Sequence, residues 1–280
     1  MTIRSILVSI DGSEAGAAPL EAAVRTAARL DAHLDVLHVR PDSLTELPAI
    51  GEAMPDHLAH KIAGHTDRQS DLRAEAARRQ FDAALASIDL RSAAWVEKTG
   101  RRHMVLQRLG RVHDLIVVGR PSHRKDISGS LVMDALFETG RPVLVVPPGF
   151  SGEFGRRIAI AWNGSPQCAR AIGGATNFFG SAEEVVALTA ESHHTPVSVV
   201  PELAAYLERH AAKVRTRVFA HMGKKPMGGK ALLTACAEEN VDLLVMGARR
   251  VARWRWRDLL LGHATGQVLR HTTLPVLMGH

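Results

Sequence analysis

The sequence predicts an α/β fold built from two tandem doubly wound domains, each a five-stranded parallel sheet with helices on both faces. Two observations lead to this prediction. Short β-branched runs alternate with alanine- and leucine-rich segments of helical period, which is typical of parallel sheets covered by helices. The same blocks then recur in the second half of the 280-residue chain. We expect a first copy over residues 1–150 and a second copy over residues 151–280.

Three pairs of matching blocks define the repeat. They are ILVSIDGS (6–13) with IAIAWNGS (158–165), DLIVVG (114–119) with DLLVMG (242–247), and PVLVV (142–146) with PVLM (275–278). The spacing between matched blocks varies, which is expected where the connecting segments differ in length. A Pro-Pro-Gly-Phe-Ser-Gly stretch over residues 147–152 is the predicted linker.

The individual elements follow from residue type and spacing. β-branched runs that end in glycine or a polar turn predict strands, and apolar residues three or four apart predict helices. In the first copy the predicted strands are 5–10, 33–39, 92–98, 114–119 and 142–147, with helices at 14–30, 56–88, 102–111 and 129–139. In the second copy the strands are 157–162, 184–190, 213–221, 242–247 and 275–278, with helices near 166–179, 197–211, 227–239 and 262–271.

Composition and charge exclude several classes of protein. The two cysteines, Cys168 and Cys236, lie far apart and make neither a disulfide framework nor a zinc ligand set, which favours a reducing, cytoplasmic compartment. The N-terminus enters a strand directly, so we expect no signal peptide, and no apolar stretch is long enough to cross a membrane. A net charge of +6 does not by itself indicate nucleic acid.

Glycine and polar residues cluster where strands end. Asp11-Gly12-Ser13 and Gly119 follow strands of the first copy, and Asn163-Gly164-Ser165 and Gly247 follow the matching strands of the second. Ligands of doubly wound sheets bind beyond the carboxyl ends of the strands, at the point where the strand order reverses. The sequence therefore predicts the binding edge of each copy.

These blocks, taken in order, resemble the universal stress protein family over essentially the whole chain, once per copy. The resemblance implies a Rossmann-like or flavodoxin-like fold of the adenine nucleotide alpha hydrolase type, a cytoplasmic location and pairing of copies through the last strand. In many members it also implies ATP or AMP binding. For this chain it suggests that Val143–Val146 lies beside Val276–Met278, and that the protein forms a homodimer.

The nucleotide-binding members of that family carry Gly-x2-Gly-x9-Gly-(Ser/Thr) after the fourth strand. Such glycines let the backbone approach phosphates, and the following helix N-terminus adds a positive dipole. In the first copy Gly119 matches the first glycine, Ser122 takes the place of the second, and Gly129-Ser130 forms the final pair after a shorter gap. Asp11 is present and implies a contact to ribose or adenine.

The second copy departs further from this pattern. Gly247 matches the first glycine, Arg250 replaces the second, and Gly262 is followed by His263 after a longer gap. Asn163 replaces the aspartate, which removes the charge but keeps one acceptor and two donors. The first copy is therefore the better nucleotide candidate.

The resulting hypothesis is a non-enzymatic regulatory protein that binds ATP or AMP, with Mg²⁺ as a further option. The predicted nucleotide-binding residues are Asp11, Gly12, Ser13, Val39, Gly119, Ser122, Gly129, Ser130, Asn163, Gly164, Gly247 and Gly262. No nucleophile with an activating base and no convergent metal ligands are apparent, so we expect at most slow ATP hydrolysis. The alternative is a nucleotide-free interaction or scaffold module whose phosphate loops have degenerated.

An arginine- and tryptophan-rich run over residues 249–257 leaves several interpretations open. It could be a solvated loop whose tryptophans pack over the sheet end, or a phosphate-binding loop, since arginine binds phosphate bidentately. It could also form a protein interface, or contact nucleic acid or a membrane surface.

Overall fold

The computed structural model describes residues 2–41, 56–121, 131–191, 200–211, 213–220, 228–252, 259–261 and 263–280. The first copy contains β1 (Ser5–Ile10), a 3-10 turn η1 (Glu14–Gly16), α1 (Ala17–Leu30), β2 (His33–Arg40), α2 (Asp56–Ser87), β3 (Ala93–Thr99), α3 (Arg102–Gly110), β4 (Leu115–Gly119), α4 (Leu131–Glu138) and β5 (Val143–Val146). The second copy contains β6 (Arg157–Trp162), α5 (Pro166–Phe179), β7 (Glu184–Glu191), α6 (Val200–Leu207), β8 (Val214–Ala220), α7 (Gly228–Glu238), β9 (Leu243–Gly247), β10 (Arg250–Ala252), β11 (Leu259–Leu261), α8 (His263–His271) and β12 (Val276–Gly279).

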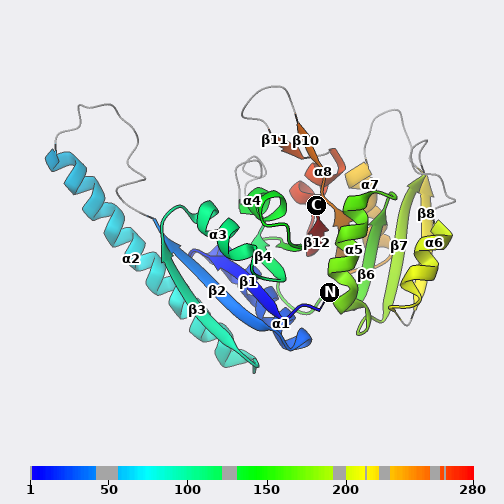
Figure 1. The fold of residues 1–280 in the computed structure, drawn as a ribbon, viewed down its shortest axis with the longest axis horizontal. Helices are drawn as coiled ribbons and strands as arrows, with labels where there is room; N and C mark the ends of the chain where they lie inside the picture. The colour runs from blue at the N-terminus through cyan, green and yellow to red at the C-terminus, as the bar shows by residue number, and fades with distance from the viewer. Residues whose placement is uncertain are drawn as a thin grey trace.

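The two copies share one ten-stranded sheet in the order β3-β2-β1-β4-β5-β12-β9-β6-β7-β8 (Figure 1). Strand pairing within each copy is parallel, as the sequence predicts. The copies meet through the antiparallel pair β5–β12, in which Val145 faces Val276 and Val143 faces Met278. The expected pairing of the last strands is confirmed, and it turns two parallel sheets into one mixed sheet.

Helices cover both faces of this sheet. The buried residues on one face come from α1, α2, α5 and α6, among them Leu20, Phe81 and Phe178. The other face packs against α3, α4, α7 and α8, for example through Leu106 and Leu136. Both apolar layers run through both copies without a break at β5–β12, so the copies share a continuous core.

The linker between the copies, which runs in the structure from the end of β5 at Val146 to the start of β6 at Arg157, is fixed to both of them. Arg29, near the end of α1, donates to the Phe154 carbonyl oxygen from Nη1 at 2.7 Å and to the Gly155 carbonyl oxygen from Nη2 at 2.8 Å. It also donates from Nε to Ser181 Oγ, just beyond α5, at 2.8 Å. A further hydrogen bond goes to the carbonyl oxygen of Phe178, in the last turn of α5, at 3.2 Å. Arg29 therefore ties the first copy to the linker and to the second copy.

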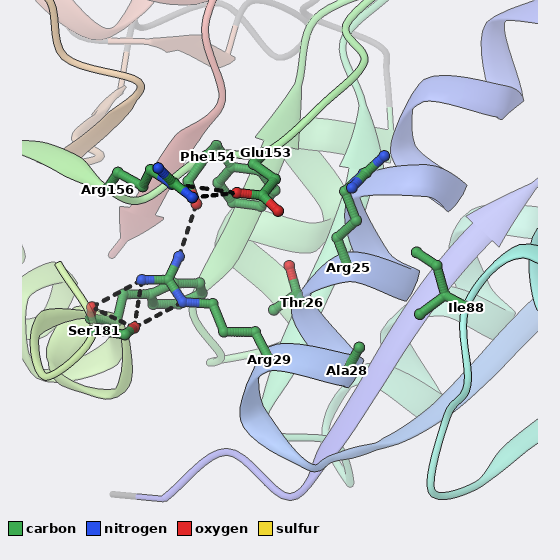
Figure 2. Close-up of a pocket in the computed structure, with 10 residues that line it drawn as sticks. Arg25, Thr26, Ala28, Arg29, Ile88, Glu153, Phe154, Arg156 and Ser181 are labelled. Carbon is green, nitrogen blue, oxygen red and sulfur yellow. Dashed lines mark hydrogen bonds and ion pairs between the residues drawn. The ribbon is translucent and has the colours of Figure 1, made fainter.

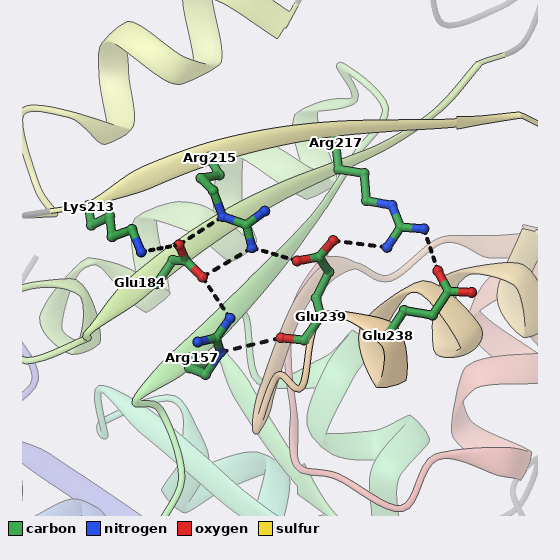
Figure 3. A network of polar contacts seen from close by, with 7 residues as sticks. All are labelled: Arg157, Glu184, Lys213, Arg215, Arg217, Glu238 and Glu239. Atoms are coloured by element: carbon green, nitrogen blue, oxygen red, sulfur yellow. Dashed lines mark hydrogen bonds and ion pairs between the residues drawn. The ribbon is translucent and has the colours of Figure 1, made fainter.

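A polar network joins the amino-terminal ends of β6, β7 and β8 (Figure 3). Glu184, whose side chain is only 3% exposed, lies 2.8 Å from Arg157 Nη2, 2.9 Å from Lys213 Nζ and 2.8 Å from Arg215 Nε. Arg215 also pairs with Glu239 at 2.5 Å. Hydrogen bonds from Arg215 and Lys213 lower the pKa of Glu184 to about 2, against the opposing effect of burial.

Replacing Glu184 with glutamine is expected to lower the free energy of unfolding by roughly 1–2 kcal/mol at pH 7, because it removes the charge but keeps the shape. The cost stays modest since the cationic partners remain more than a third exposed. The folded pKa is depressed, so the stabilisation is present above the unfolded value of about 4.5 and is lost as pH falls towards 2.

Urea unfolding of both proteins between pH 2 and pH 7 measures this difference. Glu183→Gln is the matched control, because Glu183 is 60% exposed and its Oε1 lies 3.4 Å from Arg156 Nη1. The role given to the buried carboxylate would be contradicted if the difference in free energy of unfolding between wild type and Glu184→Gln stayed constant over this pH range. An equal loss of free energy in Glu183→Gln would contradict it too.

Candidate functional site

The strand order places one reversal point in each copy. In the first copy β1 lies between β2 and β4, so the connections after β1 and β4 leave the sheet in different directions. In the second copy β6 lies between β7 and β9 in the same way. Asp11 and Gly119 thus lie at neighbouring strand ends, as do Asn163 and Gly247.

The loop after β1 is a turn organised by Asp11. Its Oδ1 accepts from the Ser13 backbone N–H at 3.1 Å and from Ser13 Oγ at 2.6 Å. Gly12 stands between them at φ +76°, a left-handed conformation that favours glycine. This turn leads into η1 and α1, and the Asp11 side chain remains 44% exposed.

Arg102, the first residue of α3, contacts the same loop. Its Nη1 lies 3.1 Å from Asp11 Oδ2, and its Nε donates to Ser9 Oγ at 3.2 Å. Burial raises the pKa of Asp11, but Ser13 and Arg102 outweigh that effect and the pKa lies below its usual value. Asp11 is therefore a carboxylate at neutral pH, with a cation beside it.

The carboxylate of Asp11 retains capacity for another donor. A carboxylate has about four lone-pair positions on its two oxygens. Ser13 occupies the two positions on Oδ1, and Arg102 occupies one on Oδ2. Among the residues that the structure describes, one acceptor position on Oδ2 is left for a ligand hydroxyl or amino group.

The second copy repeats the turn with different chemistry. Asn163 Oδ1 accepts from the Ser165 backbone N–H at 3.1 Å and from Cys168 Sγ at 3.0 Å, while Ser165 Oγ caps α5 by accepting from the Cys168 N–H at 3.3 Å. The single S–H of Cys168 is shared, since its sulfur also lies 3.3 Å from the Ala161 carbonyl oxygen, so Ser165 is the firm donor to the amide oxygen. Among the described residues, the side-chain N–H groups of Asn163 make no hydrogen bond and remain to donate. The second copy therefore presents a donor at the position where the first presents a charged acceptor.

The helix α2 covers the loop of the first copy. A Cβ at Gly12 would lie 2.2 Å from the Arg73 carbonyl oxygen and 2.9 Å from the Ala77 nitrogen. Gln80 Nε2 donates to the Ser13 carbonyl oxygen at 2.9 Å. Gly164, at the matching position of the second copy, has φ +71°, and no described residue comes within 4 Å of its Cβ position. The two loops therefore share a backbone shape but differ in what packs against them.

The remaining predicted residues fall into three groups. Gly119 and Gly247 close β4 and β9, where a Cβ would lie 3.2 Å from Pro19 Cγ and 2.7 Å from the Cys168 nitrogen, so helix packing excludes a side chain at Gly247 and leaves little room for one at Gly119. Val39 is buried at the carboxyl end of β2 in the core shared with α3 and α4. Ser122, Gly129, Ser130 and Gly262 lie outside the described residues.

The arginine- and tryptophan-rich run differs from a simple loop. Arg250–Ala252 and Leu259–Leu261 pair antiparallel as the hairpin β10–β11, which stands apart from the main sheet (Figure 1). Trp254 and Trp256 lie outside the described residues. The structure thus gives the base of this feature a definite shape and does not test its function.

Sequence reasoning missed Arg102, and only its place at a predicted helix start could have drawn attention to it. Within the described ranges, no group of three or more His, Cys, Asp and Glu side chains converges to hold a metal ion. Cys168 and Cys236 are both free and buried. None of the helices described here is long and apolar enough to cross a bilayer.

Comparisons with known proteins agree with the two-copy architecture. The model of the universal stress protein family matches twice, over residues 2–147 and 155–280. Universal stress protein Slr1230 of Synechocystis sp. is 22% identical, over 98% of this chain and 99% of that protein. The crystal structure of a universal stress protein from Archaeoglobus fulgidus is similar in fold, with a TM-score of 0.71, 16% identity and coverage of 98% of this chain and 94% of that chain. A functionally unknown protein from Pseudomonas aeruginosa, PA1789, has a TM-score of 0.54 at 16% identity, covering 98% of this chain and 92% of that chain.

Proposed function

The chain belongs to the universal stress protein family, and from that premise we propose that its first copy binds an adenine nucleotide, ATP or AMP, as a regulatory ligand. One observation carries the proposal. Asp11 is ionised, 44% exposed and placed at the reversal point of a doubly wound sheet, with an acceptor position that no described residue uses. Ribose hydroxyls and the adenine amino group are donors that match this position.

The proposal assigns different roles to the residues around Asp11. Ser13 holds the carboxylate in one orientation through its N–H and hydroxyl. Arg102 keeps Asp11 ionised and supplies positive charge near the β1–β4 strand ends, which favours an anionic ligand. Where ATP is the ligand, Mg²⁺ would arrive with the phosphates, as is usual for nucleotide sites.

The second copy is the weaker site in this proposal. Asn163 carries no charge, and its oxygen already accepts from the Ser165 N–H. A ribose hydroxyl could accept from its amide but would lose the charge-assisted hydrogen bond, which is about twice as strong as a neutral one.

The test is a thermal-unfolding titration with Mg-ATP and with AMP. A ligand that binds only the folded state raises stability by RT ln(1 + [L]/Kd). We expect a saturable shift for wild type, its loss in Asp11→Ala and its retention in Asn163→Ala. Asp11→Ala also removes the hydrogen bonds from Ser13, so its result alone does not separate ligand contact from loop structure. Asp11→Asn, which keeps those hydrogen bonds, is therefore measured beside it. An unshifted wild type at saturating nucleotide would reject the proposal.

A second candidate function is a nucleotide-free interaction module. The observation in its favour is the β10–β11 hairpin, which stands apart from the ten-stranded sheet. It predicts that the protein captures a partner and that capture fails when Trp254 and Trp256, which lie between β10 and β11 in the sequence, are both replaced by alanine. Complete partner retention by that double variant, together with a nucleotide-induced shift in wild type, would favour the nucleotide proposal instead.

We also place the protein in the cytoplasm, since its free, buried cysteines suit a reducing compartment. The last strands of the two copies already pair inside the chain, so a homodimer would have to use another surface. Light scattering would separate the 30.3 kDa chain from a dimer of twice that mass.

A further inference from the structure

A pocket of about 360 Å³ lies between the two copies, away from the proposed nucleotide site (Figure 2). The end of α1, the linker and the end of α5 form most of its wall. The lining residues used below are Arg25, Arg29, Ile88, Phe154, Arg156 and Phe178. Its volume falls within the range of sites for small molecules.

The pocket and the Asp11 loop lie at opposite edges of the sheet. The helix α1 begins at Ala17, just after the carboxyl end of β1, and returns to the amino-terminal edge, where β2 begins at His33. At 1.5 Å of rise per residue, Arg25 and Arg29 lie roughly 12 and 18 Å along the helix from Ala17. A ligand in the pocket would therefore be independent of a nucleotide at Asp11.

Arginines give the pocket its positive character. Arg25 pairs with Glu21 through Nε and Nη2, each at 2.9 Å from Oε1, and within the described part of the chain its Nη1 makes no hydrogen bond. Arg156 pairs with Glu153 at 3.1 Å and with Glu183 at 3.4 Å but is 61% exposed, and such surface pairs contribute only about 0–1 kcal/mol each. An incoming oxyanion would therefore compete with weak, exposed ion pairs for both guanidinium groups.

Arg29 adds a charge that no carboxylate neutralises directly. Its hydrogen bonds go to backbone carbonyl oxygens and to Ser181, and no carboxylate oxygen of the described residues lies within 4 Å of its guanidinium group. Figure 2 shows Arg29 below the hollow, with Arg25 on one side and Arg156 on the other. Of the described residues that line the pocket, three are arginines and one, Glu153, is acidic.

The rest of the wall is apolar and aromatic. Ile88 follows the end of α2, Phe154 lies in the linker, and Phe178 lies in the last turn of α5. A free inorganic ion would leave this surface uncovered. A ligand with an apolar body and an anionic head would instead bury it, at about 25 cal/mol for each Å² removed from water.

We propose that this pocket binds a small phosphate monoester with an aromatic or short alkyl body. The phosphate would accept from Arg25 and Arg156, which can both donate to its oxygens, and the apolar body would pack against Ile88 and Phe154. Because the wall comes from both copies, the ligand also stabilises the packing of the first copy against the second.

Isothermal titration calorimetry with phenyl phosphate tests the proposal, and inorganic phosphate and phenol serve as the two half-ligand probes. We expect one saturable site per chain for phenyl phosphate. Inorganic phosphate and phenol should each bind at least tenfold more weakly. The double variant Arg25→Ala/Arg156→Ala should lose at least tenfold in affinity. Arg91→Ala is the matched control, since Arg91 is an exposed arginine paired with Asp31 at 2.8 Å outside the pocket.

Three results would overturn the proposal: no saturable binding of phenyl phosphate to wild type, unchanged affinity in the double variant, or equal affinity for inorganic phosphate. Unfolding curves of the double variant establish that it is folded, and each single variant should show part of the loss. Mg-ATP binding by the double variant should equal that of wild type, so failure here is distinguishable from failure of the nucleotide proposal.

Discussion

Gly12→Ala is expected to lower the free energy of unfolding by about 3–4 kcal/mol. The left-handed backbone at φ +76° costs a side-chain-bearing residue about 1–2 kcal/mol. The new methyl group would also lie 2.2 Å from the Arg73 carbonyl oxygen, so α2 must move away from the β1 loop. Overpacking of this kind typically costs a further 1–3 kcal/mol. Chemical denaturation at pH 7 measures the sum.

Gly164→Ala is the matched control for that substitution. Its φ of +71° is nearly the same, but none of the described atoms lies within 4 Å of the Cβ position. Only the conformational cost remains, about 1–2 kcal/mol. Equal losses in the two variants would show that α2 does not press on the first loop and would contradict the described packing.

Arg29→Ala is expected to lower the free energy of unfolding by about 3 kcal/mol. Hydrogen bonds to a charged donor contribute about 1.5–3 kcal/mol each, though solvent access and non-additivity reduce their sum. The substitution releases the Phe154 and Gly155 carbonyl oxygens and removes the guanidinium from its place 5.5 Å from the centre of the Phe178 ring. The expected consequence is weaker coupling between the copies as well as lower stability.

Two variants separate this coupling from a general loss of charge. Arg29→Lys keeps the charge but replaces the planar fork of five donors with three donors on one nitrogen, which cannot reach all four acceptors, so it should recover little of the stability. Arg91→Ala removes an exposed arginine and should change stability by less than about 0.5 kcal/mol. Differential scanning calorimetry should show a broader transition for Arg29→Ala, and a wild-type-like transition temperature would count against the proposed role.

The strands could be predicted because their information is local. Residues 5–10 and 157–162 are β-branched runs closed by polar turns, and both form strands with those bounds. The end of α6 was harder to predict. The prediction extended to residue 211, but the chain turns after Leu207, where Arg209 and His210 donate to carbonyl oxygens three residues earlier. A tightening of that kind depends on packing at the helix end rather than on residue type.

The site could be predicted only in part, for a physical reason. Asp11 and Gly12 belong to one short segment, so the turn follows from their residue types. The contact of Arg102 with Asp11 depends on how α3 packs, and the contact of α2 with Gly12 joins residues far apart in sequence. The Arg29 contacts likewise cross from one copy to the other. None of these follows from hydrophobic period or turn chemistry.

The measurement that tests the central claim most directly is the stoichiometry of nucleotide binding by calorimetry. Mg-ATP and AMP would be titrated into wild type, Asp11→Asn and Asn163→Ala under the same conditions. We predict one site per chain in wild type and Asn163→Ala, and its loss in Asp11→Asn. Two equal sites per chain, or one site that survives in Asp11→Asn and disappears in Asn163→Ala, would contradict the assignment of the nucleotide to the first copy.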